Sequence, residues 1–226
     1  MKRGLLFPDA ASAVADIPDG SRIMFGGFAG VGVPLALIAA LNEHGAKRLT
    51  VIANGTGERQ GRPSTIEARL VTRAIVSFPV SPWSPGDAFQ KGYEEGTIDL
   101  EIVPQGTLAE RIRAGGAGIP AFYTPTGVGT SFADGKEVRE IEGKLHVLEQ
   151  ALKADYTLVR AFRADTMGNL VYRNTGRNFN PLMAAAARVT IAEVDEIVEA
   201  GELDPELIVT PGIYVNRVVV VAGSSG

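Results

Sequence analysis

The segment with the clearest chemical potential is a glycine-rich stretch, residues 26–32 (GGFAGVG), between the apolar run 23–25 and Pro34. This order predicts a buried strand, a loop with little side-chain bulk, and a helix that has proline in its first turn. At a helix start the backbone N–H groups are unpaired and the positive end of the helix dipole lies behind them. Such a loop favours an anion or a polarised carbonyl brought close to the main chain.

Two familiar nucleotide motifs do not fit this stretch. The dinucleotide-binding spacing GxGxxG fails because Leu35 stands where the third glycine belongs after Gly30 and Gly32. The lysine of a P-loop is missing too. From the glycine content alone, a tight packing turn and a ligand-binding loop remain equally open.

A second unusual segment, residues 77–86 (SFPVSPWSPG), contains three prolines and Trp83, the single tryptophan of the sequence. A regular strand cannot continue through this many prolines. The segment is either a rigid surface loop or a loop that walls a ligand pocket.

Composition excludes several kinds of chemistry. The chain has no cysteine, so thiolate nucleophiles, disulfides and cysteine-based metal sites are ruled out. Its 22 basic and 26 acidic residues give a net charge of −4, which does not favour a nucleic-acid partner. The two histidines do not cluster with carboxylates, and we expect no metal site.

Length indicates one domain, residues 1–226, and the absence of cysteine fits a reducing, cytoplasmic setting. The amino-terminal apolar run is too short for a signal peptide, and no stretch reaches the ~20 apolar residues of a membrane span.

Several elements must position the glycine loop. Short apolar runs rich in β-branched residues alternate with helical segments, which predicts an α/β fold with a mixed, mainly parallel sheet flanked by helices. The expected strands are residues 22–25, 49–53, 73–77, 100–103, 156–161, 188–193 and 207–210. Helices are expected at residues 34–44, 107–114 and 180–187, and a hairpin over 136–152 that turns at Gly143.

Longer motifs connect these segments to a known family. The pattern Asp19-Gly20-x-x-Ile23-Met24-Phe25-Gly26-Gly27-Phe28-x-x-x-Gly32-x-Pro34 resembles the first coenzyme A transferase signature, with every defined position filled. Residues 104–130, 168–187 and 201–219 resemble the first of the two subunits of 3-oxoacid CoA-transferases, in the correct order. These motifs are nearest to those of the 3-oxoadipate and acetoacetate enzymes.

The resemblance implies a fold and a reaction. The fold would be the one that CoA-transferases share with certain sugar-phosphate isomerases. The chain would be the A-type (alpha) subunit, which works with a homologous B-type (beta) subunit and takes CoA and acyl-CoA as substrates, with no permanent cofactor. CoA would pass from succinyl-CoA or a similar donor to 3-oxoadipate or acetoacetate through a glutamate on the B-type subunit.

The resemblance also implies roles for individual residues. Gln105, in the PQG motif, would donate an amide N–H to the oxyanion formed at the thioester carbonyl. A set of loop residues would bind CoA: Gly26, Gly27, Phe28, Ala29, Gly30, Val31 and Gly32.

Four further residues are candidates for the substrate pocket: Asn54, Gly55, Gly57 and Trp83. Asn54 could hydrogen-bond substrate or only form a turn. Gly55 departs from the family pattern, where asparagine is expected. The proline-rich 77–86 segment departs from it as well, which leaves the identity of the acid open, and Trp83 could shape a pocket for a longer or more apolar acid.

Two alternatives use the same fold. The first is a stand-alone isomerase or hydrolase with Glu110 or Asp165 as its base. The second is a non-catalytic CoA-binding module. Turnover by the chain alone would favour the first, and CoA binding without a partner would favour the second.

Overall fold

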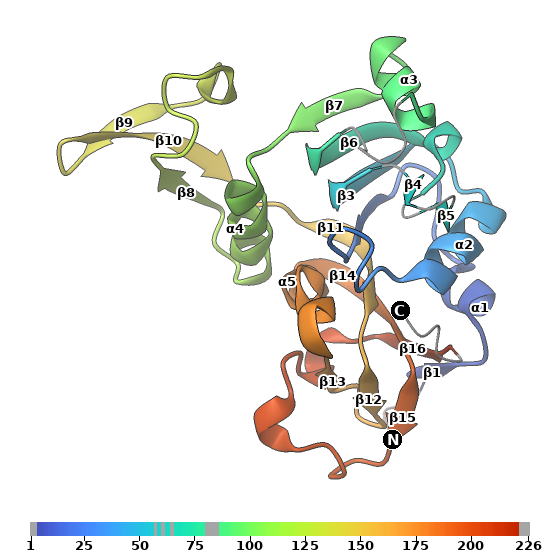
Figure 1. Cartoon of the computed structure of the whole chain (residues 1–226). Coiled ribbons are helices and arrows are strands. Elements are labelled where there is room, and N and C mark those ends of the chain that lie inside the picture. Colours follow the sequence, from blue (N-terminus) through green and yellow to red (C-terminus); the bar gives the residue numbers. More distant parts are fainter. Residues whose placement is uncertain (1–3, 57, 60–61, 64–65, 80–85, 222–226) are drawn as a thin grey trace.

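The computed structural model describes the chain except residues 1–3, 57, 60–61, 64–65, 80–85 and 222–226. Its main feature is an eight-stranded sheet in the order β1-β16-β14-β11-β2-β3-β6-β7, in which all neighbouring pairs run parallel (Figure 1). The strands are β1 (Leu6–Phe7), β2 (Arg22–Phe25), β3 (Leu49–Gly55), β6 (Val71–Phe78), β7 (Asp99–Ile102), β11 (Ala154–Arg160), β14 (Ala187–Val194) and β16 (Arg217–Val220). Strands buried on both faces read as continuous apolar runs, which is why the sequence revealed most of them.

Helices cover both faces of this sheet. On one face lie α1 (Ala10–Val14), α2 (Leu35–His44) and α3 (Ala88–Glu94), and on the other α4 (Gln105–Gly116) and α5 (Asn180–Ala185). Because side chains alternate along a strand, Ile23 joins the first hydrophobic core and Met24 the second. The expected mixed, mainly parallel α/β architecture is confirmed.

The topology defines a natural ligand edge. From β2 the chain moves outward through β3, β6 and β7, and it then returns to the other side of β2 as β11. The order of strands therefore reverses between β2 and β11. In parallel sheets, ligands bind beyond the carboxyl ends of the strands at such a switch point. The glycine loop follows β2 at this position.

A smaller antiparallel sheet projects from the main body (Figure 1). It contains β8 (Ala121–Thr124), β9 (Val138–Ile141) and β10 (Lys144–Gln150). The β9–β10 hairpin turns at Glu142 and Gly143, which both have positive φ (51° and 74°), as a two-residue hairpin turn requires. The hairpin predicted over residues 136–152 is confirmed.

An arginine joins this sheet to the main body. Arg111 of α4 donates to the carbonyl of Gln150 (2.7 Å) and pairs with Glu101 of β7 (2.6 Å). Its guanidinium also lies 3.7 Å from Glu149 of β10, which pairs with Lys136 at 2.6 Å. One buried cation thus connects α4, β7 and β10.

Short elements complete the described residues. A three-stranded sheet contains β12 (Arg163–Asp165), β13 (Leu170–Val171) and β15 (Glu196–Val198), and a ribbon contains β4 (Glu58–Arg59) and β5 (Arg62–Pro63). The 3₁₀ turns are η1 (Ala68–Leu70), η2 (Ser131–Ala133), η3 (Asn174–Arg177), η4 (Pro205–Leu207) and η5 (Gly212–Tyr214).

One predicted strand is wrong. Residues 207–210 form no strand, because η4 includes Leu207, which is 57% exposed, and Thr210 makes only an isolated bridge to Leu170. Flanking prolines 205 and 211 cannot donate to a sheet ladder, which explains the failure. The last strand of the main sheet is β16, whose Val218 and Val219 are buried.

Two helix boundaries also differ from the prediction. The helix expected at residues 107–114 starts earlier, at Gln105, so that Gln105 lies in its first turn. The helix expected at 180–187 ends at Ala185, and Ala187 already begins β14.

Candidate active site

The tip of the glycine loop is a tight turn. Phe28 and Val31 exchange two backbone hydrogen bonds of 3.0 and 2.9 Å. The residues between them, Ala29 and Gly30, have φ values of 50° and 84°, as in a type I′ turn. Phe28 and Val31 remain 44% and 43% exposed. The loop therefore presents an apolar tip to solvent.

The base of the loop is closely packed. A Cβ atom at Gly26 would lie 1.8 Å from the Asn180 Oδ1 atom, and one at Gly32 would lie 2.5 Å from the Gly176 carbonyl oxygen. At Gly27, Cβ would approach Val33 to 2.5 Å. The two interpretations left open by the sequence thus divide the loop: its base is a packing turn, and only its tip is free to approach a ligand.

The start of α2 is occupied by the chain itself. The Leu37 N–H donates to the carboxylate of Glu193 in β14 at 3.0 Å. Burial raises the pKa of Glu193 to about 7, against the opposing effect of the backbone N–H groups at residues 35–37 and of Arg160. The expectation that these N–H groups are free for a ligand anion is therefore wrong at this helix.

Glu193 was not singled out from the sequence. It is only 3% exposed and lies in the apolar strand ARVTIAEV. A charged residue inside a buried strand must find a partner, because an isolated charge there is costly. That signal could have identified it.

Two candidate residues far apart in the sequence come together at the carboxyl edge of the sheet. The Gln105 Nε2 group donates to the Oδ1 atom of Asn54 at 2.6 Å. Gln105 opens α4, and Asn54 is the penultimate residue of β3 and 8% exposed. A primary amide carries two N–H hydrogens, so Gln105 keeps a second donor. Asn54 therefore fixes the direction of the Gln105 amide.

Gly55 allows β3 and β6 to approach each other. A Cβ there would lie 3.1 Å from the carbonyl oxygen of Phe78, which accepts the Thr56 N–H at 3.1 Å. The Thr56 hydroxyl lies 3.0 Å from the hydroxyl of Tyr93. Two further pocket candidates, Gly57 and Trp83, lie outside the described residues.

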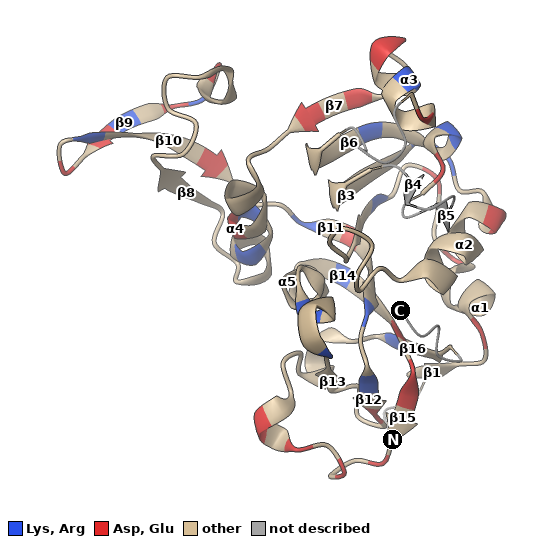
Figure 2. Cartoon of the chain, viewed as in Figure 1, with Lys and Arg blue, Asp and Glu red and all other residues tan. Residues whose placement is uncertain are grey.

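The glycine loop and the start of α2 carry no charged side chains of their own. Figure 2 shows no Lys, Arg, Asp or Glu on either segment, and the sequence has none from residue 23 to 42. The charge that acts on this helix start is therefore supplied from β14, by the buried Glu193.

The carboxylates considered for a stand-alone hydrolase or isomerase have other partners. Glu110 forms three hydrogen bonds with Arg113, of 2.7 to 3.0 Å, and this arginine lowers the pKa of Glu110. Asp165 is 3% exposed and accepts the backbone N–H groups of Met167 and Asn169, each at 2.9 Å. Both carboxylates are committed to structural bonds, so neither suits a general base.

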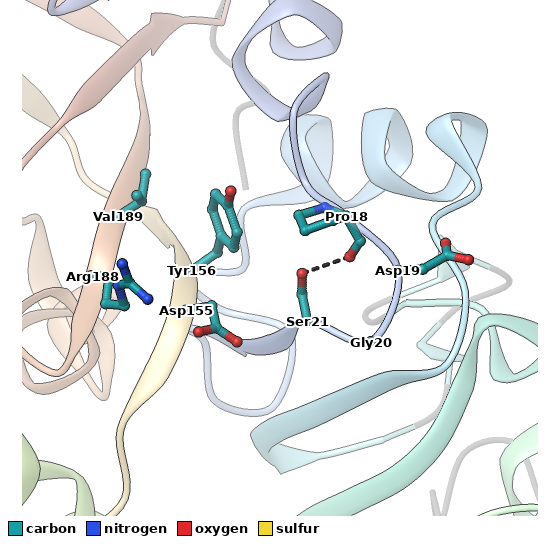
Figure 3. Close-up of a pocket in the computed structure, with 8 residues that line it drawn as sticks. All are labelled: Pro18, Asp19, Gly20, Ser21, Asp155, Tyr156, Arg188 and Val189. Atoms are coloured by element: carbon teal, nitrogen blue, oxygen red, sulfur yellow. Dashed lines mark hydrogen bonds between the residues drawn. The ribbon is translucent and has the colours of Figure 1, made fainter.

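A separate pocket of about 360 Å³ lies at the opposite edge of the sheet (Figure 3). It is lined by Pro18, Asp19, Gly20, Ser21, Asp155, Tyr156, Arg188 and Val189, near the amino ends of β2, β11 and β14. The Asp155 carboxylate already accepts the Arg22 N–H at 2.9 Å. Among the residues that the structure describes, none of the candidate site residues lines this pocket. No helix in the described part of the chain is long and apolar enough to cross a membrane.

An all-parallel sheet with a glycine loop at its switch point and paired amides beside it is the arrangement of a ligand-binding α/β enzyme. The coenzyme A transferase family model matches residues 7–221, and the chain belongs to this family.

Named relatives agree with that assignment, and a solved structure shares the fold. The chain is 50% identical over 220 residues to the A-type subunit of 3-oxoadipate CoA-transferase from Pseudomonas putida, covering 97% of this chain and 94% of that one. It is 51% identical to the A-type subunit of succinyl-CoA:3-ketoacid coenzyme A transferase from Xanthomonas campestris pv. campestris (strain B100), covering 94% and 87%. The acyl-CoA transferase YdiF of E. coli O157:H7, solved as a thioester complex with CoA, superposes with a TM-score of 0.83 at 22% identity. The alignment covers 99% of this chain and 48% of YdiF, so the chain spans about half of that protein.

Proposed function

We propose that the chain is the A-type subunit of a two-subunit 3-oxoacid CoA-transferase in the cytoplasm. The enzyme moves CoA from succinyl-CoA or a similar short donor to a 3-oxo acid such as 3-oxoadipate or acetoacetate. The observation that carries this proposal is the 50% identity to the corresponding chain of a 3-oxoadipate CoA-transferase over nearly the full length of both. In this proposal residues 1–226 act as one unit beside a homologous B-type subunit.

The proposed chemistry begins on the partner. There, the carboxylate of a glutamate attacks the thioester carbonyl, the CoA thiolate leaves, and a mixed anhydride forms. The thiolate then attacks the glutamyl carbonyl, which releases the first acid and leaves CoA on the enzyme as a thioester. The second acid repeats these two steps in reverse and departs as the new acyl-CoA.

This chain contributes electrostatic stabilisation to the attack. As the thioester carbonyl becomes tetrahedral, its oxygen gains negative charge, and the second N–H of the Gln105 amide donates to it. A neutral donor already oriented by Asn54 (2.6 Å) stabilises this charge without reorganisation during the reaction. Gln105 is therefore the catalytic residue that this chain supplies.

The glycine loop, residues 26–32, binds the pantetheine end of CoA. Its exposed apolar tip, with Phe28 and Val31, suits the uncharged pantetheine chain. Asn54 and Gly55 border the acid, and Gly57 and Trp83 are kept as sequence-based candidates for the same pocket.

A transfer assay tests the proposal directly. The chain is purified alone and after co-expression with the product of the adjacent gene, and succinyl-CoA-dependent transfer is measured against a panel of 3-oxo acids. We expect activity only in the co-expressed sample, with the preferred acid identifying the acceptor. Activity of the lone chain would contradict the division of labour between the two chains, and activity in neither sample would contradict the transferase assignment for this panel.

A further inference from the structure

Three polar side chains from the carboxyl-terminal half of the chain hold the glycine loop and the helix that follows it. We propose that Asn178, Asn180 and Glu193 are positioning residues that fix this loop in its CoA-binding conformation. The inference rests on the proposed function, because it assigns these residues to the loop that would bind CoA.

Asn180 holds the base of the loop. It is fully buried, and its Nδ2 group donates to the carbonyls of Gly32 (3.0 Å) and Gly176 (2.9 Å). Its Oδ1 atom accepts the Arg160 N–H at 3.0 Å and occupies the space that a side chain at Gly26 would need. Since both ends of the amide are paired, its orientation is fixed, and the path of the loop is fixed with it.

Asn178 brackets the exposed tip. Its Oδ1 atom accepts the N–H of Gly27 at 3.1 Å, and its Nδ2 group donates to the carbonyl of Val31 at 3.0 Å. These two contacts lie on either side of the Phe28–Val31 turn. One side chain therefore sets the direction in which the apolar tip points.

Glu193 anchors the helix at the end of the loop. Its carboxylate accepts the Leu37 N–H at 3.0 Å, which closes the start of α2 to a phosphate of CoA. Arg160, the neighbouring residue in β11, lies 3.6 Å from this carboxylate and also pairs with Asp195. On the other side of β14, the residue beside Glu193 is the apolar Val219 of β16. The start of α2 has no titratable side chain. CoA must therefore reach the loop through its tip.

Three isosteric substitutions test these roles in the co-expressed complex: Asn178→Asp, Asn180→Asp and Glu193→Gln. Each aspartate loses the amide donor and faces a carbonyl oxygen, and the glutamine loses the charge at the helix start. We measure kcat and KM for succinyl-CoA and the Kd of free CoA by calorimetry. We expect KM and Kd to rise about tenfold or more, and kcat to change less than about threefold.

The acidity of Glu193 adds a readout that a purely structural residue would not affect. Burial raises the pKa of Glu193 to about 7, so the carboxylate that accepts the Leu37 N–H becomes protonated as the pH falls from 8 to 6. The loss of this negative charge at the start of α2 should raise the wild-type KM. In the Glu193→Gln complex, this pH dependence of KM should disappear.

Asn42→Asp is the matched control. Asn42 is a buried asparagine of α2 whose Oδ1 atom accepts the Glu67 N–H at 2.8 Å, away from the glycine loop, and its substitution should leave KM unchanged. If Asn180→Asp fails to fold, the partly buried Asn178 decides the question. A wild-type KM in Asn178→Asp overturns the positioning role. A wild-type complex that binds no CoA instead contradicts the proposed function.

Discussion

At the scale of single residues, the candidate site consists of neutral amides held by other polar groups. Gln105 and Asn54 were both candidates from the sequence, but their contact joins residues separated by 51 positions and depends on the order of β3 and β7 in the sheet. Residue types can be read from one segment at a time. The direction of an amide side chain cannot be read from one segment, because it is set by the groups that the fold places opposite it.

Replacing Gln105 by alanine tests its proposed catalytic role. The substitution removes the donor to the oxyanion and leaves the glycine loop intact, so turnover of the assembled enzyme should fall by ~10² to 10³ while the Kd of CoA changes little. Steady-state kinetics and calorimetry measure both quantities. Gln150→Ala, on the exposed end of β10, is the control and should keep full activity. A loss of less than about threefold in Gln105→Ala would sink the assignment.

Glu193 should make stability depend on pH. Its pKa is raised from 4.5 to about 7, so the native state holds a proton that the unfolded chain releases between these values. The stability associated with the protonated carboxyl is therefore present below pH 4.5 and is lost as the pH rises through 7. By linkage, this loss is about 3 kcal/mol.

Urea unfolding of the wild type and of Glu193→Gln at pH 5 and pH 8 measures this contribution. From pH 5 to pH 8, the wild type should lose roughly 2–3 kcal/mol of unfolding free energy that Glu193→Gln keeps. In Glu110→Gln, the difference in unfolding free energy between pH 5 and pH 8 should change in the opposite direction and by less than in Glu193→Gln, because Arg113 lowers the pKa of Glu110. An unchanged difference for Glu193→Gln would show that its carboxyl titrates as in the unfolded chain.

At the scale of elements, the strands and helices that carry the site were largely predictable, and the supports between them were not. β2 and the glycine loop follow from apolar patterning and composition. The hairpin of β9 and β10 follows from Gly143. The strand predicted at residues 207–210 does not form, because the flanking prolines prevent a sheet ladder despite the apolar content of the segment.

The ion pairs of Arg111 should matter because they are buried. Arg111→Ala leaves the carboxylates of Glu101 and Glu149 without this cation, and the free energy of unfolding should fall by roughly 3–5 kcal/mol. Urea denaturation measures the change. Arg113→Ala, two positions along the same helix, breaks a pair exposed to water and should have little effect. Equal losses in the two variants would mean that burial of Arg111 contributes nothing.

At the scale of the whole molecule, the eight-stranded parallel sheet is the rigid part, and the antiparallel sheet of β8, β9 and β10 is peripheral. β2, β3, β11 and β14 each have a strand on both sides, whereas the β8–β10 sheet contacts the body mainly through α4. Local stability follows the number of packed neighbours. The candidate site therefore stands on the most stable part of the described chain.

Hydrogen exchange should reproduce this order. Amides in the four central strands should exchange slowest, through global unfolding, and those of β9 and β10 markedly faster. Mass spectrometry of peptides from the whole chain measures both sets at once, with the edge strand β7 as an internal comparison. Faster exchange in β2 than in β9 would contradict the assignment of the rigid core.

The pairing of β1 with β16 has a consequence for how the protein is made. Leu6 and Phe7 lie beside Val218 and Val219, and β2 must wait for β11 before its second side is covered. A ribosome delivers β1 (Leu6–Phe7) long before its neighbour β16 (Arg217–Val220). Non-local pairing of this kind slows folding and leaves open strand edges on the growing chain. The sheet can close only after β16 has been synthesised, and until then the nascent chain depends on protection from its surroundings.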